Sequence, residues 1–400
     1  MPETQSSATN AVRDGLYRAL RAITPLRLIV RTVRRWIDDR RVPVWLLEGR
    51  ERNGREPLRI AFAGQIENMA YISELAFGDT TIAVAHGSQW IKNVGSWARR
   101  RAGDDGLVVI NVDERWRNLF ARERGFWLPI WLGGEIDVDA VIARMQHSRN
   151  AKEDLRRFRN RGITWEITTT VEAFKHFYST MHVPYVKNVF GDRAWVETYE
   201  DVRQRMPQCE LLLAVQRGEP IAGQVIEYYK PGHAAEWFLG VKNGDRSYVK
   251  LGVIKALDYF TALHLAQRGY KKCHLGGTRP FLHDPVLHRK VRRRGMRVTD
   301  HWQKGFALSF SRLSPGIAAF LAHNPFVHES AGAYRGAVFV SAEPPLHSDT
   351  IRNLFDQHYV EGMSGFDIFL LGHSSTAVDV PPNLRAKVYI QQIEESKGSE

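Results

Sequence analysis

The sequence predicts an α/β protein in which mixed, mostly antiparallel central sheets are flanked by helices. Three observations indicate this fold class. Residues 209–241 contain three apolar runs separated by Gly/Pro turns at 217–220 and 230–232, which is typical of an antiparallel meander. A helical pattern, a short strand, a basic helix and a further strand follow between residues 247 and 310. Upstream, residues 42–150 alternate between strand-like and helix-like patterns.

Composition narrows the class of protein. A chain of 400 residues predicts two to three domains, and 44% hydrophobic with 25% charged residues is ordinary for a globular protein. Its two cysteines, Cys209 and Cys273, stand on strand-like segments, so we expect buried thiols in a reducing, cytoplasmic compartment. No Cys/His cluster has metal-ligand spacing, and we expect no metal. The net charge of +12 favours an anionic partner, or serves solubility alone.

The first 41 residues form a basic amphipathic segment. Arginines alternate with leucine, isoleucine and valine from Val12 onward, and Pro25 interrupts the pattern. No apolar run is long enough to cross a bilayer. The segment could lie on an anionic membrane, peripherally at its inner face, or pack on its own domain.

The remaining elements follow in order. Within 42–147 we expect buried strands at 81–87 and 106–113, with a helix between them. Helices open the next domain at 148–206, and residues 181–187 are expected to break between two of them. The chain after 316 predicts a strand, a helix and two strands, an added α/β layer.

Three stretches resemble one known family. These are SRNAKEDLRRFRNRGITWEI (148–167), QCELLLAVQRGEPIAGQVI (208–226) and YKKCHLGGT (270–278). In this order they resemble the opening helix, the central hairpin and the cleft strand of the GNAT acyltransferase superfamily, in the branch shared with FemAB-type peptidyltransferases. The resemblance covers roughly residues 148–310 and implies tandem GNAT-like domains, at 42–147 and 148–315, followed by a C-terminal α/β extension at 316–400.

The resemblance also implies a function. The protein would move an acyl group from acyl-CoA (such as acetyl-CoA) or aminoacyl-tRNA to an amine or hydroxyl acceptor. That acceptor would be a small molecule or a lipid- or glycan-linked one, in envelope polysaccharide, peptidoglycan or glycolipid biosynthesis. The alternative is a non-catalytic protein of the same fold that binds an anionic lipid, a glycan or nucleic acid.

Donor phosphates are expected at the start of a helix over 247–267, where free N–H groups and the helix dipole attract anions. The cofactor-binding candidates are Arg246, Ser247, Lys250 and Gly252. The superfamily's glycine-rich phosphate loop is not legible in KNGDRSYVKLG (242–252). Relatives that use aminoacyl-tRNA have a similarly degenerate loop, so both donors remain open.

In the GNAT-like fold, two neighbouring strands part and receive the donor carbonyl; here these strands would be AAEWFLGV and KKCHLGG. Glu236 on the first or His274 on the second could take the acceptor's proton, and each could equally be a half-buried polar residue. By alternation, Glu236 faces away from Trp237, and His274 away from Cys273.

Four residues are candidates for the acceptor side. Tyr185 and Lys187 lie in the stretch that, in the resembled family, overhangs the acceptor. Gly277 leaves room for a substrate near the backbone, or only makes a turn. Asp284 follows the cleft strand.

Two basic stretches, at 149–161 and 289–294, could grip tRNA or anionic lipid phosphates, or be solvated helix faces.

Overall fold

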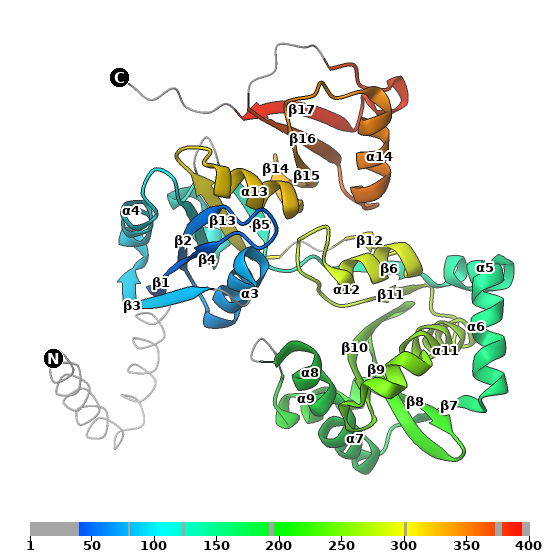
Figure 1. Cartoon of the computed structure of the whole chain (residues 1–400). Helices are drawn as coiled ribbons and strands as arrows, with labels where there is room; N and C mark the ends of the chain where they lie inside the picture. The colour runs from blue at the N-terminus through cyan, green and yellow to red at the C-terminus, as the bar shows by residue number, and fades with distance from the viewer. Residues whose placement is uncertain are drawn as a thin grey trace, which may run out of the picture.

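A computed structural model of the chain describes residues 40–78, 81–121, 125–191, 196–299, 302–372 and 378–393. Its strands form three sheets with helices packed on their faces (Figure 1). The mixed α/β fold class predicted from the sequence is therefore confirmed. The basic N-terminal segment, apart from its last two residues, and the tail after residue 393 lie outside the described residues.

The first sheet has the strand order β3-β1-β2-β4-β13-β5, in which only β2 and β4 are parallel neighbours. Side chains of a strand alternate between its two faces. Leu58, Ile60 and Phe62 of β2 therefore pack on the side of α3 and α13, whereas Ala61 and Ala63 pack on the side of α4. The bounds are β1 (Arg41–Arg50), β2 (Pro57–Ala63), α3 (Ile66–Phe77), β3 (Ile82–Trp90), α4 (Ile91–Ala102), β4 (Leu107–Asp113), η1 (Glu114–Leu119), β5 (Gly125–Pro129), β13 (Lys304–Phe310) and α13 (Pro315–His323).

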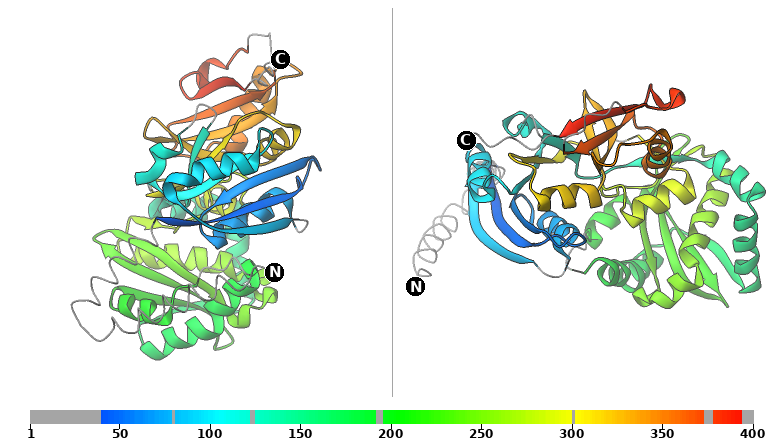
Figure 2. Two further views of the ribbon diagram at one scale, coloured as in Figure 1. Left: turned by 90° about the vertical axis from the view of Figure 1, so that its left-hand side faces the viewer. Right: turned by 45° about the horizontal axis from the view of Figure 1, so that its top comes forward.

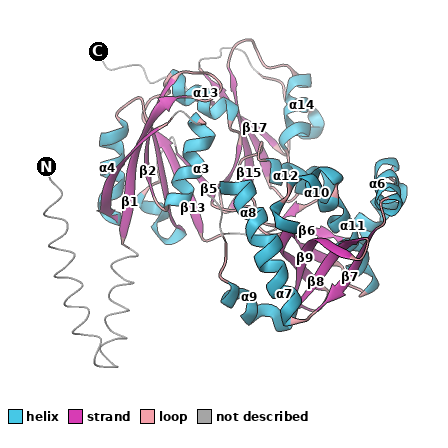
Figure 3. Ribbon diagram, turned by 60° about the horizontal axis from the view of Figure 1, so that its bottom comes forward, coloured by secondary structure: helices cyan, strands magenta, loops and turns pink. Residues whose placement is uncertain are grey.

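The second sheet has the order β12-β6-β11-β10-β9-β8-β7, again with a single parallel pair, β10 and β11. Figure 3 shows α7 and α8 along one side of it. Leu211 and Leu213 of β8 face α7, and Leu212 and Ala214 face α11. The strands are β6 (Gly134–Asp137), β7 (Ile163–Thr168), β8 (Cys209–Gln216), β9 (Glu219–Lys230), β10 (His233–Val241), β11 (Lys272–His274) and β12 (Arg297–Val298). The helices are α5 (Val138–His147), α6 (Arg149–Asn160), α7 (Val171–Phe177), η2 (Tyr178–His182), α8 (Val183–Phe190), α9 (Tyr199–Arg205), η4 (Met206–Gln208), η5 (Lys242–Gly244), α10 (Arg246–Leu251), α11 (Val253–Gln267), α12 (Pro285–His288) and η6 (Arg289–Arg293).

The third sheet has the order β14-β15-β16-β17, with an antiparallel first pair and two parallel pairs after it. Its strand–helix–strand core is the added α/β layer that the sequence predicts. Figure 2 shows this layer, in orange and red, beside both the first sheet and the α12 region. The bounds are β14 (Phe326–Ser330), β15 (Ala333–Ser341), α14 (Ser348–His358), β16 (Gly365–Leu371), η7 (Pro382–Leu384) and β17 (Val388–Ile393).

The chain exchanges strands between the first two sheets. β6 precedes residue 148, yet it pairs with β11 and β12 in the second sheet. β13 follows the second sheet's helices in the chain, yet it lies between β4 and β5 in the first. The two sheets are thus joined by two crossing connections, near residues 130–134 and 298–304.

Three local expectations are wrong. The strand expected to be buried at 81–87 is the edge strand β3, where Ile82 is 67% exposed. The expected break at 181–187 is helical, because η2 continues directly into α8. The expected single helix at 247–267 is two helices, since Gly252 adopts a left-handed φ of 93° between α10 and α11. No helix among the described residues is long and apolar enough to cross a membrane.

Candidate active site

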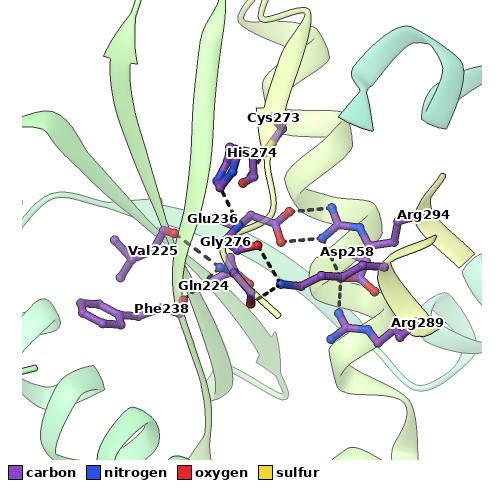
Figure 4. A network of polar contacts seen from close by, with 12 residues as sticks. Gln224, Val225, Glu236, Phe238, Asp258, Cys273, His274, Gly276, Arg289 and Arg294 are labelled. Carbon is purple, nitrogen blue, oxygen red and sulfur yellow. Dashed lines mark hydrogen bonds and ion pairs between the residues drawn. The ribbon is translucent and has the colours of Figure 1, made fainter. Parts of the chain in front are cut away.

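β10 and β11 run in parallel for a short distance and then separate. Their ladder ends at the pair Ala235–His274. β11 stops there, and Gly276 takes a φ of 68° that turns the chain away. β10 continues, with an irregular register against β9 between Glu236 and Leu239. The strands therefore part at Glu236 and Gly276 (Figure 4), as the resemblance implies for the donor carbonyl.

A closed group of charges lies at this parting (Figure 4). The guanidinium of Arg294 donates to both oxygens of Glu236, at 2.5 and 2.6 Å, and lies 3.3 Å from Asp258 of α11. Arg289 bonds Asp258 at 2.5 Å. The side chains of Arg294 and Glu236 are only 5% and 8% exposed. Burial opposes the charge of Arg294, but Glu236 and Asp258 more than compensate and raise its pKa. Two arginines thus pair with two carboxylates, so the buried charges of this group compensate each other.

Lys290 holds the turn that follows β11. Its Nζ donates to the carbonyl oxygens of Gly276 at 3.1 Å and Gly277 at 3.0 Å. Burial lowers the pKa of this lysine to about 8, although Glu236 opposes the shift. A lysine whose pKa is lowered to about 8, at the place where two strands part, is a candidate functional residue.

The two candidate bases, Glu236 and His274, both lie at the parting, but their acceptor atoms accept different hydrogen bonds. Both oxygens of Glu236 accept charged hydrogen bonds from Arg294, whereas Nδ1 of His274 accepts one bond from the main-chain N–H of Gly276, at 3.1 Å. A charged bond contributes about 1.5–3 kcal/mol and a neutral one about 1 kcal/mol. Breaking the bond between His274 and Gly276 therefore costs less than breaking the two bonds between Glu236 and Arg294.

Two side chains form hydrogen bonds with main-chain carbonyls of β10 where its register is irregular. Nε2 of Gln224 donates to the carbonyl of Phe238 at 3.0 Å (Figure 4). Nδ1 of the buried His182, at the end of η2, bonds the carbonyl of Leu239 at 2.9 Å. Burial lowers the pKa of His182, so its neutral ring donates this bond from Nδ1–H. Side chains of β9 and η2 thus bond two successive carbonyls of the irregular stretch of β10.

The predicted donor contacts lie on two helices. Asp245 caps α10, and its carboxylate accepts from the N–H of Ser247 at 2.7 Å. Gly252 then begins α11, whose start has no side-chain cap. Asp245 therefore caps the start of α10, whereas the start of α11 at Gly252 lacks a side-chain cap. Lys250 is exposed beside it, and Arg246 donates to the main chain of α8.

Among the acceptor-side candidates, Tyr185 is the one near the charge network. Burial raises its pKa, while the neighbouring charges of Arg289 and Arg246 lower it. The phenol thus lies within electrostatic range of both arginines, on the half-buried side of α8. Lys187, two residues on, is exposed.

Gly277 and Asp284 have structural surroundings. A Cβ at Gly277 would lie 3.2 Å from the Cβ of Trp131, so this indole occupies the space above the glycine. Asp284 caps α12, accepting from the N–H groups of Val286 at 2.9 Å and Leu287 at 3.0 Å. Both residues shape the turn after β11.

Sequence reasoning named Lys290 and Arg294 only as members of the 289–294 basic run, and it gave no role to Asp258 or His182. One signal was available: Lys290 and Arg294 are four residues apart in a helical stretch, so they share a face. The basic run 289–294 therefore has an inward side that binds its own protein.

The second sheet and this site share one arrangement: a meander, a helix and a short parallel strand lead to a place where two neighbouring strands part. No family model matches the chain, and no curated protein matches it. Solved structures match at low similarity. L-PGS from Bacillus licheniformis is 12% identical, with 66% of this chain and 81% of that chain covered and a TM-score of 0.31.

Two further matches are acetyltransferase-like by name. A GCN5-related N-acetyltransferase from Kribbella flavida is 14% identical, with 57% of this chain and 80% of that chain covered and a TM-score of 0.28. A tandem GNAT protein from the clavulanic acid biosynthesis pathway is 10% identical, with 58% and 76% covered and a TM-score of 0.28.

Proposed function

We propose that this protein is an acyltransferase, which moves an acyl or aminoacyl group from a thioester or ester donor to an amine or hydroxyl acceptor. The donor carbonyl would lie where β10 and β11 part. The observation that carries this proposal is that their ladder ends at Ala235–His274, beside a buried group of fixed charges.

The parting supports acyl transfer because the reaction develops negative charge on the donor's carbonyl oxygen. Fixed dipoles and cations stabilise that charge without having to reorganise. Arg294 and Lys290 supply cations whose positions are set by Glu236 and by two carbonyls. Main-chain groups of β10 beyond Ala235 have no pairing with β11 and can face the oxygen.

Proton transfer falls to His274 in this proposal. Nδ1 would give up its bond to Gly276 and take the proton of the acceptor as the new bond to the carbonyl carbon forms. The same proton would then pass to the leaving thiolate or alkoxide. Glu236 holds Arg294 in place throughout and keeps its charge.

The substrates are proposed from the sequence. The donor is acyl-CoA or aminoacyl-tRNA, with its phosphates near Gly252 and Lys250, and Arg246 close by. The acceptor is a small molecule or a lipid- or glycan-linked one, on the Tyr185 and Lys187 side. A FemAB-like role in envelope biosynthesis, in the cytoplasm with residues 1–41 at the inner face of the membrane, belongs to the same proposal.

The test measures binding and product together. Hydrogen exchange of residues 242–252 is followed with acetyl-CoA and with aminoacyl-tRNA, and mass spectrometry follows label transfer to a panel of amines and alcohols. The proposal expects saturable protection of this segment by one donor and a transferred product from the same donor. Protection elsewhere by polyanions, with no product from either donor, would favour a non-catalytic binding protein instead.

A further inference from the structure

A hollow of about 690 Å³ lies between the α12–η6 segment and the end of α14 in the third sheet. This volume is in the range of small-molecule sites, about 300–1,000 Å³. The hollow shares Arg289 with the charge group at the strand parting, and its other lining residues have no role in the proposed acyl transfer. Its ionisable lining consists of three histidines and three arginines: His283, His288, His358, Arg289, Arg292 and Arg293.

No carboxylate of the described residues lines this hollow. Arg289 donates a hydrogen bond to Asp258, which does not line the hollow. Arg292 donates to the main-chain carbonyls of Asp356 and Gln357, at the end of α14. These contacts fix two guanidinium groups in the wall, and the second ties the wall to the third sheet.

Arg293, like Arg292, is an exposed arginine of the hollow. Its main-chain carbonyl accepts a bond from Arg144 at 3.0 Å, which fixes the backbone here. Within the described part of the chain, no carboxylate lies within ion-pair distance of its guanidinium. Its charge is therefore available to a ligand.

Two histidines of the hollow, His283 and His358, lie close together. The rings of His283 and His358 are 5.0 Å apart, and Nδ1 of His283 bonds the carbonyl of His323 at 3.1 Å. Burial, together with the neighbouring His283 and Arg292, lowers the pKa of His358 to about 4. Burial disfavours any charge, but the positive charge of Arg292, which contributes to this shift, favours an anion.

A second cavity provides a comparison. It lies between α6, α11 and the other side of η6, has a volume of about 490 Å³, and also borders Arg292 and Arg293. Its lining includes Glu153, Asp154 and Asp258, so its cations are neutralised. Of these two cavities, the first is the one with no acid in its lining.

We propose that the hollow between α12–η6 and α14 binds the phosphate group of a phosphorylated ligand. Arginine's planar fork matches phosphate oxygens in pairs, and neutral imidazoles add N–H donors. The site exists only because the third sheet packs against η6, which gives the C-terminal layer a binding role. It does not depend on acyl transfer, so either proposal can fail without the other.

The test uses the full chain and two sources of phosphate. Calorimetry measures the binding of inorganic phosphate and of glycerol phosphate, and co-sedimentation measures binding to phosphatidylcholine vesicles with and without phosphatidic acid. Arg293→Gln is compared with Arg100→Gln, which removes the same charge from an exposed position on α4. We expect Arg293→Gln to weaken binding by about tenfold in at least one arm, because a charged hydrogen bond is lost. Arg100→Gln should change it less than about twofold.

The arm that responds identifies the source: a soluble phosphate ester, or a lipid headgroup. NMR of the His358 imidazole adds a readout at the site itself, since a bound anion should raise its pKa from about 4. Circular dichroism checks that both variants are folded. The proposal is overturned if no phosphate source binds saturably, if the two variants lose affinity equally, or if the His358 titration is unchanged at saturation.

Discussion

Replacing Glu236 by glutamine should make transient local opening of the second sheet more frequent, while the folded structure stays the same. The carboxylate accepts two charged bonds from Arg294 in surroundings where both side chains are nearly buried. Breaking a buried pair by removing one partner costs about 3–5 kcal/mol, because the remaining charge stays unpaired. Asp258 still lies 3.3 Å from Arg294, and glutamine keeps one acceptor oxygen. We therefore expect the lower end of this range, about 3 kcal/mol.

Hydrogen exchange of peptides that cover β10 and β11 measures this loss directly. A cost of about 3 kcal/mol corresponds to exchange that is roughly a hundredfold faster. The control is Glu361→Gln, which removes the same charge from the pair with Arg297, where both side chains are more than half exposed. Such surface pairs contribute about 0–1 kcal/mol, so exchange in β12 should hardly change. Equal exchange in wild type and Glu236→Gln would refute the claim that this pair holds the strand parting.

Three other outcomes follow from the same contacts. Burial raises the pKa of Asp367, but hydrogen bonds from His328 and Arg335 outweigh burial and leave the pKa below its usual 3.8. The folded state is therefore stabilised above pH 3.8, and this stabilisation is lost as the pH falls through the lowered pKa. Between about pH 5 and about pH 2, the melting temperature of the wild type should fall by more than that of Asp367→Asn. Lys250→Glu should weaken donor binding in calorimetry by more than Arg100→Glu, and equal losses would reduce the contact to general electrostatics. Lys290→Met should lower turnover at least about tenfold with donor affinity kept, because the carbonyls of Gly276 and Gly277 lose the two bonds that Nζ donates; unchanged turnover in a donor assay would remove Lys290 from the site.

Much of the site's frame could be predicted from the sequence. The meander at 209–241 has clear apolar runs and turn residues, and the parallel return of 272–274 follows from the helix between them. The left-handed Gly252 was not predicted, although a glycine inside a helical pattern is a warning of a break.

The strand exchange could not be predicted. β6 is four residues long and too short to show a periodicity, and the alternation of β13 does not say which sheet it joins. The partner of Glu236 was equally hidden, because Arg294 is 58 residues away and closes a run of similar basic residues. The buried Arg294 can be told from the arginines that line the hollow, Arg289, Arg292 and Arg293, only in the folded structure.

The pH–rate profile of His274→Ala against wild type tests the central claim most directly. With a donor that the wild type accepts, the account predicts a rate lower by roughly 10²–10⁴ and loss of the acidic limb of the profile, while Glu236→Gln retains that limb. A His274→Ala variant that keeps its rate and its acidic limb, or an intact protein that forms no product from acyl-CoA or aminoacyl-tRNA, would contradict acyl transfer at the parting of β10 and β11.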